Sequence, residues 1–190
     1  EIGVEIEMCP STSGFKSWRA MAFSPLTNAL YIPVTLNCEL ATFGPAERIL
    51  GGGGTGPVRR INTPHPASEG NLGELLVIDI RNGEVMWRHR TPSPINTAAL
   101  TTAGGLVFAG DWDRHMYAYN AQSGDILWQT RLPTSTQGFP ISYLANGKQY
   151  VAIPVGGGGS SWSTTLPREL APSIRRPRNG NSLHVFALPN

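Results

Sequence analysis

The chain has 190 residues, the length of one ordinary domain with its own core. It contains 22 glycines and 16 prolines but only 15% charged residues, a composition typical of many turns and short strands rather than helices. The net charge is +2 and most basic residues are scattered, which argues against nucleic-acid binding. The arginines at 175, 176 and 178 are interpreted as part of a solvated loop. No apolar run reaches about 18 residues, so no membrane span is expected.

The first repeating unit begins with strand-like runs at residues 18–23 and 30–34, on either side of a turn at 25–28. Residues 36–72 are rich in glycine, proline and polar residues, and we expect them to form a long insertion. A hairpin over residues 77–87 then supplies the last two strands. The unit therefore has four short strands.

An internal repeat links this hairpin to a second one. Residues 77–87 align with residues 118–128 at an offset of 41 residues. The alignment pairs Asp79 with Asn120, Gly83 with Gly124, and Trp87 with Trp128. In each copy a strand leads into Asp or Asn, then a glycine suited to positive φ, then a strand that ends in Trp.

The remaining strand-like runs are residues 96–102, 106–110, 139–144, 149–153 and 183–188. A second insertion is expected at residues 156–181. Together these runs predict three four-stranded units at about residues 17–90, 96–131 and 137–188, of which the last lacks its fourth strand. Antiparallel units of about 40 residues are typical of β-propeller blades, and rings need about 4 to 8 of them. The sequence predicts an all-β protein whose remaining blades lie outside this chain.

The sequence also contains a pair of cysteines and a pair of aspartates whose roles have to be considered. Cys9 and Cys38 form no CxxC motif, and they are either two buried thiols or one disulfide, which would imply an oxidising compartment. Asp111 and Asp113 flank Trp112 after a strand, and we interpret them as turn residues rather than as a carboxylate pair at work.

The run from Ala118 to Trp128 resembles the tryptophan-docking motif of quinoprotein propellers, in which a Trp of one blade packs against the next blade. Residues 9–38, including both cysteines, and residues 101–111 and 147–153 are similar to segments of the pyrroloquinoline quinone (PQQ) dependent alcohol and methanol dehydrogenases. The likeness corresponds to about the last third of those enzymes. It implies an eight-bladed ring closed by an N-terminal strand, and a disulfide between Cys9 and Cys38.

The resemblance also implies an activity. PQQ would lie near the ring axis with a Ca²⁺ or lanthanide ion, and an alcohol would be oxidised by hydride transfer to PQQ. The family's metal ligands and its Asp base precede the matching region, so no catalytic or metal-binding residue is expected here, and the isolated chain is expected to be inactive. The implied partners are the remaining blades, an alcohol substrate and a cytochrome c electron acceptor, and the implied location is the periplasm.

Three residues correspond to the family's cofactor site. The family commonly has Lys-Asn-Trp where this chain has Ser17 before Trp18, so a single hydroxyl replaces the amide that bonds PQQ. Trp18 is expected to be either a cofactor wall or core packing. Asn96 stands where the methanol enzymes have an aromatic residue, and it either bonds PQQ or caps a turn.

A glycine-rich segment falls where the family has a loop at the cavity mouth. Gly156 and Gly157 are expected to let the backbone approach the cofactor, and Trp162 to line the substrate entrance; the alternative is a flexible surface loop.

A different class of function also fits the docking motif, namely a non-catalytic propeller that serves as a scaffold for protein binding. The cysteine segment and the two insertions favour the enzyme.

Overall fold

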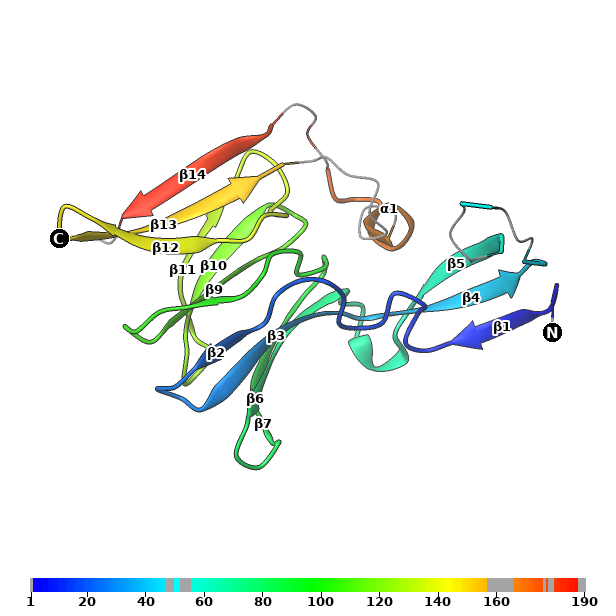
Figure 1. The fold of residues 1–190 in the computed structure, drawn as a ribbon, viewed down its shortest axis with the longest axis horizontal. Coiled ribbons are helices and arrows are strands. Elements are labelled where there is room, and N and C mark those ends of the chain that lie inside the picture. The colour runs from blue at the N-terminus through cyan, green and yellow to red at the C-terminus, as the bar shows by residue number, and fades with distance from the viewer. Residues whose placement is uncertain are drawn as a thin grey trace.

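The computed structural model describes residues 2–46, 50–51, 56–156, 166–175, 177 and 180–187. The described residues form four antiparallel sheets (Figure 1), as the all-β prediction required. Within them, helical structure is limited to α1 (Leu166–Leu170) and the 3-10 turn η1 (Pro66–Ser68). Neither is long or apolar enough to cross a membrane.

The first blade is a four-stranded sheet in the order β2-β3-β6-β7. Its strands are β2 (Ala22–Ser24), β3 (Ala29–Thr35), β6 (Gly73–Asp79) and β7 (Val85–Thr91). The strand expected from residue 18 starts later, at Ala22. The carbonyl of Ala20 instead accepts a hydrogen bond from Ala99 N of the next blade, at 3.1 Å.

The second and third blades repeat this arrangement. The second contains β8 (Leu100–Thr101), β9 (Leu106–Gly110), β10 (His115–Asn120) and β11 (Ile126–Arg131). The third contains β12 (Ile141–Ala145), β13 (Lys148–Val155) and β14 (Ser182–Ala187), and its sheet has three strands in the described part of the chain. The described residues thus form three propeller blades, the last with three strands.

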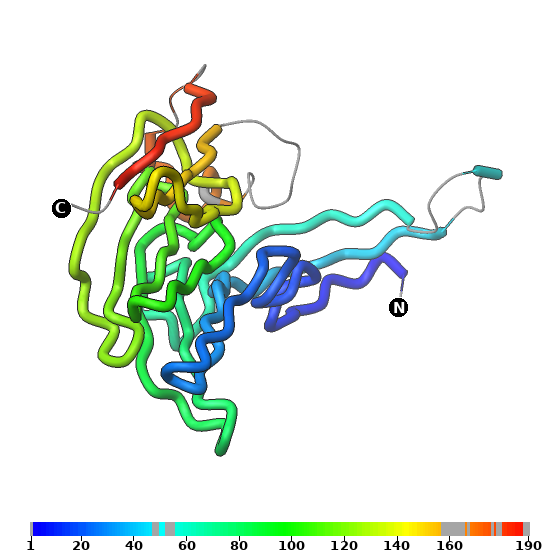
Figure 2. The backbone as a smooth tube through the Cα atoms, turned by 60° about the vertical axis from the view of Figure 1, so that its left-hand side comes forward, coloured from blue at the N-terminus to red at the C-terminus, as the bar shows by residue number. Residues whose placement is uncertain are grey.

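The segment expected to be an insertion between residues 36 and 72 contains regular structure that the sequence did not indicate. β4 (Asn37–Phe43) and β5 (Val58–Pro64) pair along their whole length, and β1 (Glu5–Met8) pairs with the other edge of β4. Figure 2 shows this sheet as a long arm that runs out from the blades.

The apolar core lies between neighbouring blades. One buried cluster joins the first two blades, and a second joins the last two. Because side chains alternate along a strand, β9 contributes to both: Val107 faces the first cluster and Phe108 the second. The second blade is therefore covered on both faces. Exposed apolar side chains remain on β12 and β14 of the third blade, namely Ile141, Tyr143, Leu144, Leu183 and Val185.

The repeated tryptophans dock each blade onto the next one. Trp87 donates from Nε1 to Ala121 O at 3.0 Å and lies directly over Gly124, which has a φ of 79°. Trp128 packs against the third blade, where it meets Phe186 edge-on at 5.0 Å between ring centroids. The interpretation of both tryptophans as packing residues is confirmed.

Candidate functional site

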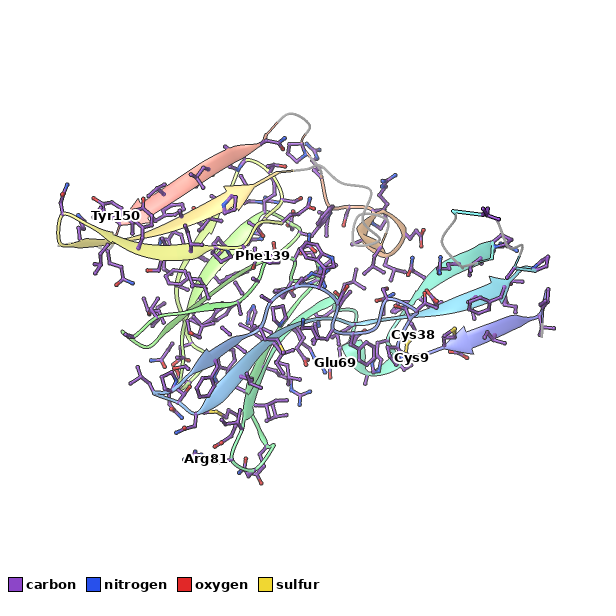
Figure 3. The ribbon with its side chains drawn as sticks, in the orientation of Figure 1. Cys9, Cys38, Glu69, Arg81, Phe139 and Tyr150 are labelled. Atoms are coloured by element: carbon purple, nitrogen blue, oxygen red, sulfur yellow. A yellow bond between two sulfur atoms is a disulfide. The ribbon has the colours of Figure 1, made fainter. Side chains whose placement is uncertain are left out.

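The first strands of the three blades form the inner edge of the fold, where β2 and β8 lie side by side. Trp18 precedes β2 and Phe139 precedes β12, and their rings stack at 5.6 Å between centroids and 27° between planes. This contact joins the segment before the first blade to the segment before the third. Trp18 remains 53% exposed and Phe139 41% exposed, so Trp18 is not a core residue. Figure 3 shows Phe139 on this inner side.

A buried hydrogen-bonded group, the Arg19 cluster, lies beside this aromatic pair and consists of Arg19, Thr35 and Asn96. Arg19 donates from Nε and Nη2 to Asn96 Oδ1, at 3.0 and 2.8 Å, and from Nη1 to Thr35 Oγ1 at 2.9 Å. The three residues are 3%, 6% and 0% exposed. Asn96 therefore does not cap a turn; its side-chain oxygen binds the guanidinium.

The Arg19 cluster carries a positive charge that no carboxylate of the described residues compensates. No carboxylate of the described residues lies within ion-pair distance of Arg19, and burial lowers its pKa to about 10. The guanidinium is still charged at neutral pH. Asn96 Nδ2 is also buried, and it has no hydrogen-bond partner among the described residues. The cluster thus has a surplus of donors and positive charge.

The other expected site residues lie around this cluster. Ser17 is half-buried; its carbonyl accepts from Lys16 Nζ at 2.7 Å, and its hydroxyl bonds no described residue. Gly156 bonds Ser135 O through its N–H, and its carbonyl accepts from Gln137 Nε2 at 2.8 Å. A Cβ there would lie 2.8 Å from Asn181 Oδ1, the end of a side chain that can move aside. Gly157 and Trp162 lie outside the described residues.

The Cys9–Cys38 disulfide expected from the resemblance is present (Figure 3). It ties the segment before Ser17 and Trp18 to β4. Nearby, Ser11 N donates to Asn37 O at 3.2 Å and Thr12 N donates to Glu39 Oε1 at 3.0 Å. The disulfide and these bonds fix the approach of the chain to the inner edge.

Asp111 acts in a turn, as expected. It accepts hydrogen bonds from His115 N at 2.9 Å and from Tyr117 Oη at 3.1 Å, and burial raises the pKa of its carboxyl. Asp113 instead pairs with Arg131 at 2.7 Å. Both carboxylates line a hollow of about 600 Å³. Within the described residues, no three His, Cys, Asp or Glu side chains gather as a metal site.

Sequence reasoning missed Arg19 and Phe139. The signal for Arg19 was a single charge within the run from Trp18 to Phe23, which is otherwise largely apolar. Nothing in the sequence indicated that Phe139 meets Trp18, because the two residues belong to different blades.

The sheets, the docked tryptophans and the interblade cores define a segment of a β-propeller. The family model for the β-propeller domain of PQQ-dependent glucose, ethanol and alcohol dehydrogenases matches residues 58–151. The chain is 30% identical to a quinoprotein ethanol dehydrogenase of Pseudomonas aeruginosa, over 99% of this chain and 29% of that protein. It is 32% identical to a 1-butanol dehydrogenase (cytochrome c) of Thauera butanivorans, over 94% of this chain and 26% of that protein.

Among solved structures, a europium-containing methanol dehydrogenase superimposes with a TM-score of 0.84 and 26% identity, over 99% of this chain and 36% of the other. The chain is thus a segment of a quinoprotein β-propeller of the alcohol and methanol dehydrogenase type. It spans about 30% of the length of the curated relatives that it matches.

Proposed function

We propose that the chain is the C-terminal part of a PQQ-dependent dehydrogenase that oxidises an alcohol. The relatives named above are quinoprotein alcohol dehydrogenases, which supports the family-level function. The observation that carries the proposal for this chain is Asn96 Nδ2, a buried donor without a partner among the described residues, at the edge where three blades meet. An unpaired buried donor costs about 1–3 kcal/mol, and an acceptor on a bound molecule would remove that cost.

The residues at the inner edge fit a planar, oxygen-rich cofactor. PQQ supplies the hydride acceptor for alcohol oxidation when it is bound. The stacked rings of Trp18 and Phe139 offer a partly exposed aromatic surface beside the Arg19 cluster. Asn96 donates to an oxygen of the ligand, Ser17 adds a hydroxyl, and Gly156 lets the backbone lie close to it. Gly157 and Trp162 would continue this wall toward the cavity mouth.

The rest of the enzyme is proposed to come from further blades. The exposed apolar side chains of β12 and β14 support a neighbour against the third blade. The ligands of a Ca²⁺ or lanthanide ion and the catalytic base would lie on those blades. We propose a periplasmic location and a cytochrome c acceptor; in support, one relative is named as cytochrome c linked and the Cys9–Cys38 disulfide fits an oxidising compartment.

The test uses the complete protein, that is, this chain with the blades that complete the ring. Loaded with PQQ and either Ca²⁺ or La³⁺, it is expected to reduce an electron-accepting dye in the presence of a primary alcohol. Trp18→Ala is expected to weaken PQQ binding while changing the unfolding midpoint little, because this side chain is 53% exposed. No turnover and no PQQ binding by the wild-type protein would refute the proposal. The 190-residue chain alone is expected to show no turnover.

A further inference from the structure

The Arg19 guanidinium is a buried cation without a counter-charge in the described part of the chain. Taking a charged group out of water costs several kcal/mol unless a partner compensates it. The side chains that bind Arg19, Thr35 and Asn96, are both neutral. A neutral amide such as Gln could also bridge the two blades, with two donors in place of three and a lower desolvation cost. The positive charge therefore requires its own explanation.

The hydrogen bonds of the Arg19 cluster indicate on which side of the Asn96 amide an acceptor for Nδ2 must lie. A guanidinium has five N–H donors, and the bonds to Thr35 and Asn96 use three of them. Two of these three converge on Asn96 Oδ1, which fixes the orientation of the amide. Nδ2, on the other side of the same amide, must then point away from the guanidinium, and it is the atom that lacks a partner.

We propose that Arg19 is a positioning residue that aims Asn96 Nδ2 at a carboxylate oxygen of bound PQQ and offsets the charge of that carboxylate. This inference rests on the proposed function, because PQQ is a planar tricarboxylic acid. A carboxylate supplies both of the things that the Arg19 cluster lacks, an acceptor and a negative charge. Hydrogen bonds to charged groups contribute about 1.5–3 kcal/mol, roughly twice the value for neutral pairs.

The experiment measures PQQ affinity of the complete apo-protein, from quenching of tryptophan fluorescence in the presence of Ca²⁺ or La³⁺. Arg19→Met removes the charge and is expected to weaken PQQ binding about 10- to 100-fold. Arg19→Lys keeps the charge but loses the planar fork; it is expected to bind PQQ at least about fivefold more tightly than Arg19→Met. The control is Arg88→Met on β7, whose half-exposed side chain lies 4.0 Å from Glu74 and which is expected to bind like the wild type.

Two further measurements separate charge recognition from a purely structural role. The trimethyl ester of PQQ carries no carboxylate charge, so Arg19→Met is expected to change its affinity less than about threefold. Asn96→Asp gives Arg19 a carboxylate inside the protein, and it is expected to fold and to lose at least about tenfold in PQQ affinity. This variant keeps the test available if Arg19→Met does not fold.

The results separate a failure of the role proposed for Arg19 from a failure of PQQ binding itself. Equal losses in Arg19→Met and Arg19→Lys, or wild-type affinity in Arg19→Met or Asn96→Asp, would overturn the role of the Arg19 charge while leaving PQQ binding intact. If the wild-type protein binds no PQQ, the proposed function itself fails.

Discussion

The docking of Trp87 on Gly124 predicts that a single methyl group added at position 124 lowers the stability of the fold strongly. A Cβ at Gly124 would lie 2.6 Å from Cδ2 and 2.8 Å from Cε3 of the indole, which is too close for carbon atoms that are not bonded to each other. The φ of 79° adds a backbone cost of about 1–2 kcal/mol for a residue with a Cβ. Forcing the indole away adds about 1–3 kcal/mol of overpacking. Gly124→Ala is therefore expected to lower the free energy of unfolding by about 2–5 kcal/mol.

The matched control is Gly105→Ala in the same blade. Gly105 has a φ of 75° but no atom within 4 Å of an added Cβ, so only the backbone cost of about 1–2 kcal/mol is expected. Urea unfolding of the complete protein would give both values. In a Trp87→Ala background, Gly124→Ala is expected to cost no more than Gly105→Ala. Equal effects of the two glycine substitutions in the wild-type background would refute the docking argument.

Two further predictions concern covalent and electrostatic links. Cys38→Ser removes the Cys9–Cys38 disulfide, which closes a loop whose ends are 29 residues apart, and it is expected to lower the free energy of unfolding by about 3–4 kcal/mol. Two free thiols in the unreduced, denatured wild-type protein would show that the disulfide does not form. Hydrogen bonds from Arg81 lower the pKa of Asp79 to about 2, below the value of about 3.9 in unfolded chains. The stability that the ionised Asp79 contributes is present above about pH 4 and is lost as the pH falls toward 2. Asp79→Asn is therefore expected to make the urea midpoint of unfolding fall less steeply between about pH 4 and pH 2. The same slope in the variant and the wild type would contradict this prediction.

The sequence predicted those parts of the fold whose determinants are local. Both hairpins of the 41-residue repeat have their strands, and each carries a register shift at the equivalent place, after Val77 and after Ala118. Gly83 and Gly124 both adopt positive φ, as their position after Asp or Asn predicts. Alternating apolar residues and turn-forming glycines are properties of neighbouring residues, so they are visible in the sequence alone.

The features that the sequence did not indicate depend on distant partners. β4 and β5 form an arm. The side chains of β5 are exposed or half-buried, and its sequence therefore lacks a regular alternation of apolar residues. Arg19 and Asn96 are 77 residues apart in sequence. An arginine is normally a surface residue, and only the junction of two blades makes this one a buried group. Of the Arg19 cluster, the sequence singled out Asn96 as a candidate but did not indicate Arg19, which binds its side-chain oxygen.

The position of Asn96 in the second blade determines how well its amide can be held. That blade is covered on both faces, and the segment before β8 is fixed by bonds from Asn96 N to Gly110 O at 2.9 Å and from Gly110 N to Thr97 Oγ1 at 2.8 Å. Thr136 Oγ1 adds a bond to Asp111 O at 2.7 Å, which ties the next blade to the same turn. Binding groups recognise a ligand best when packing and neighbouring hydrogen bonds hold them in place. Substitutions that loosen this turn, such as Thr97→Val, should therefore reduce PQQ affinity through Asn96 without touching the cofactor.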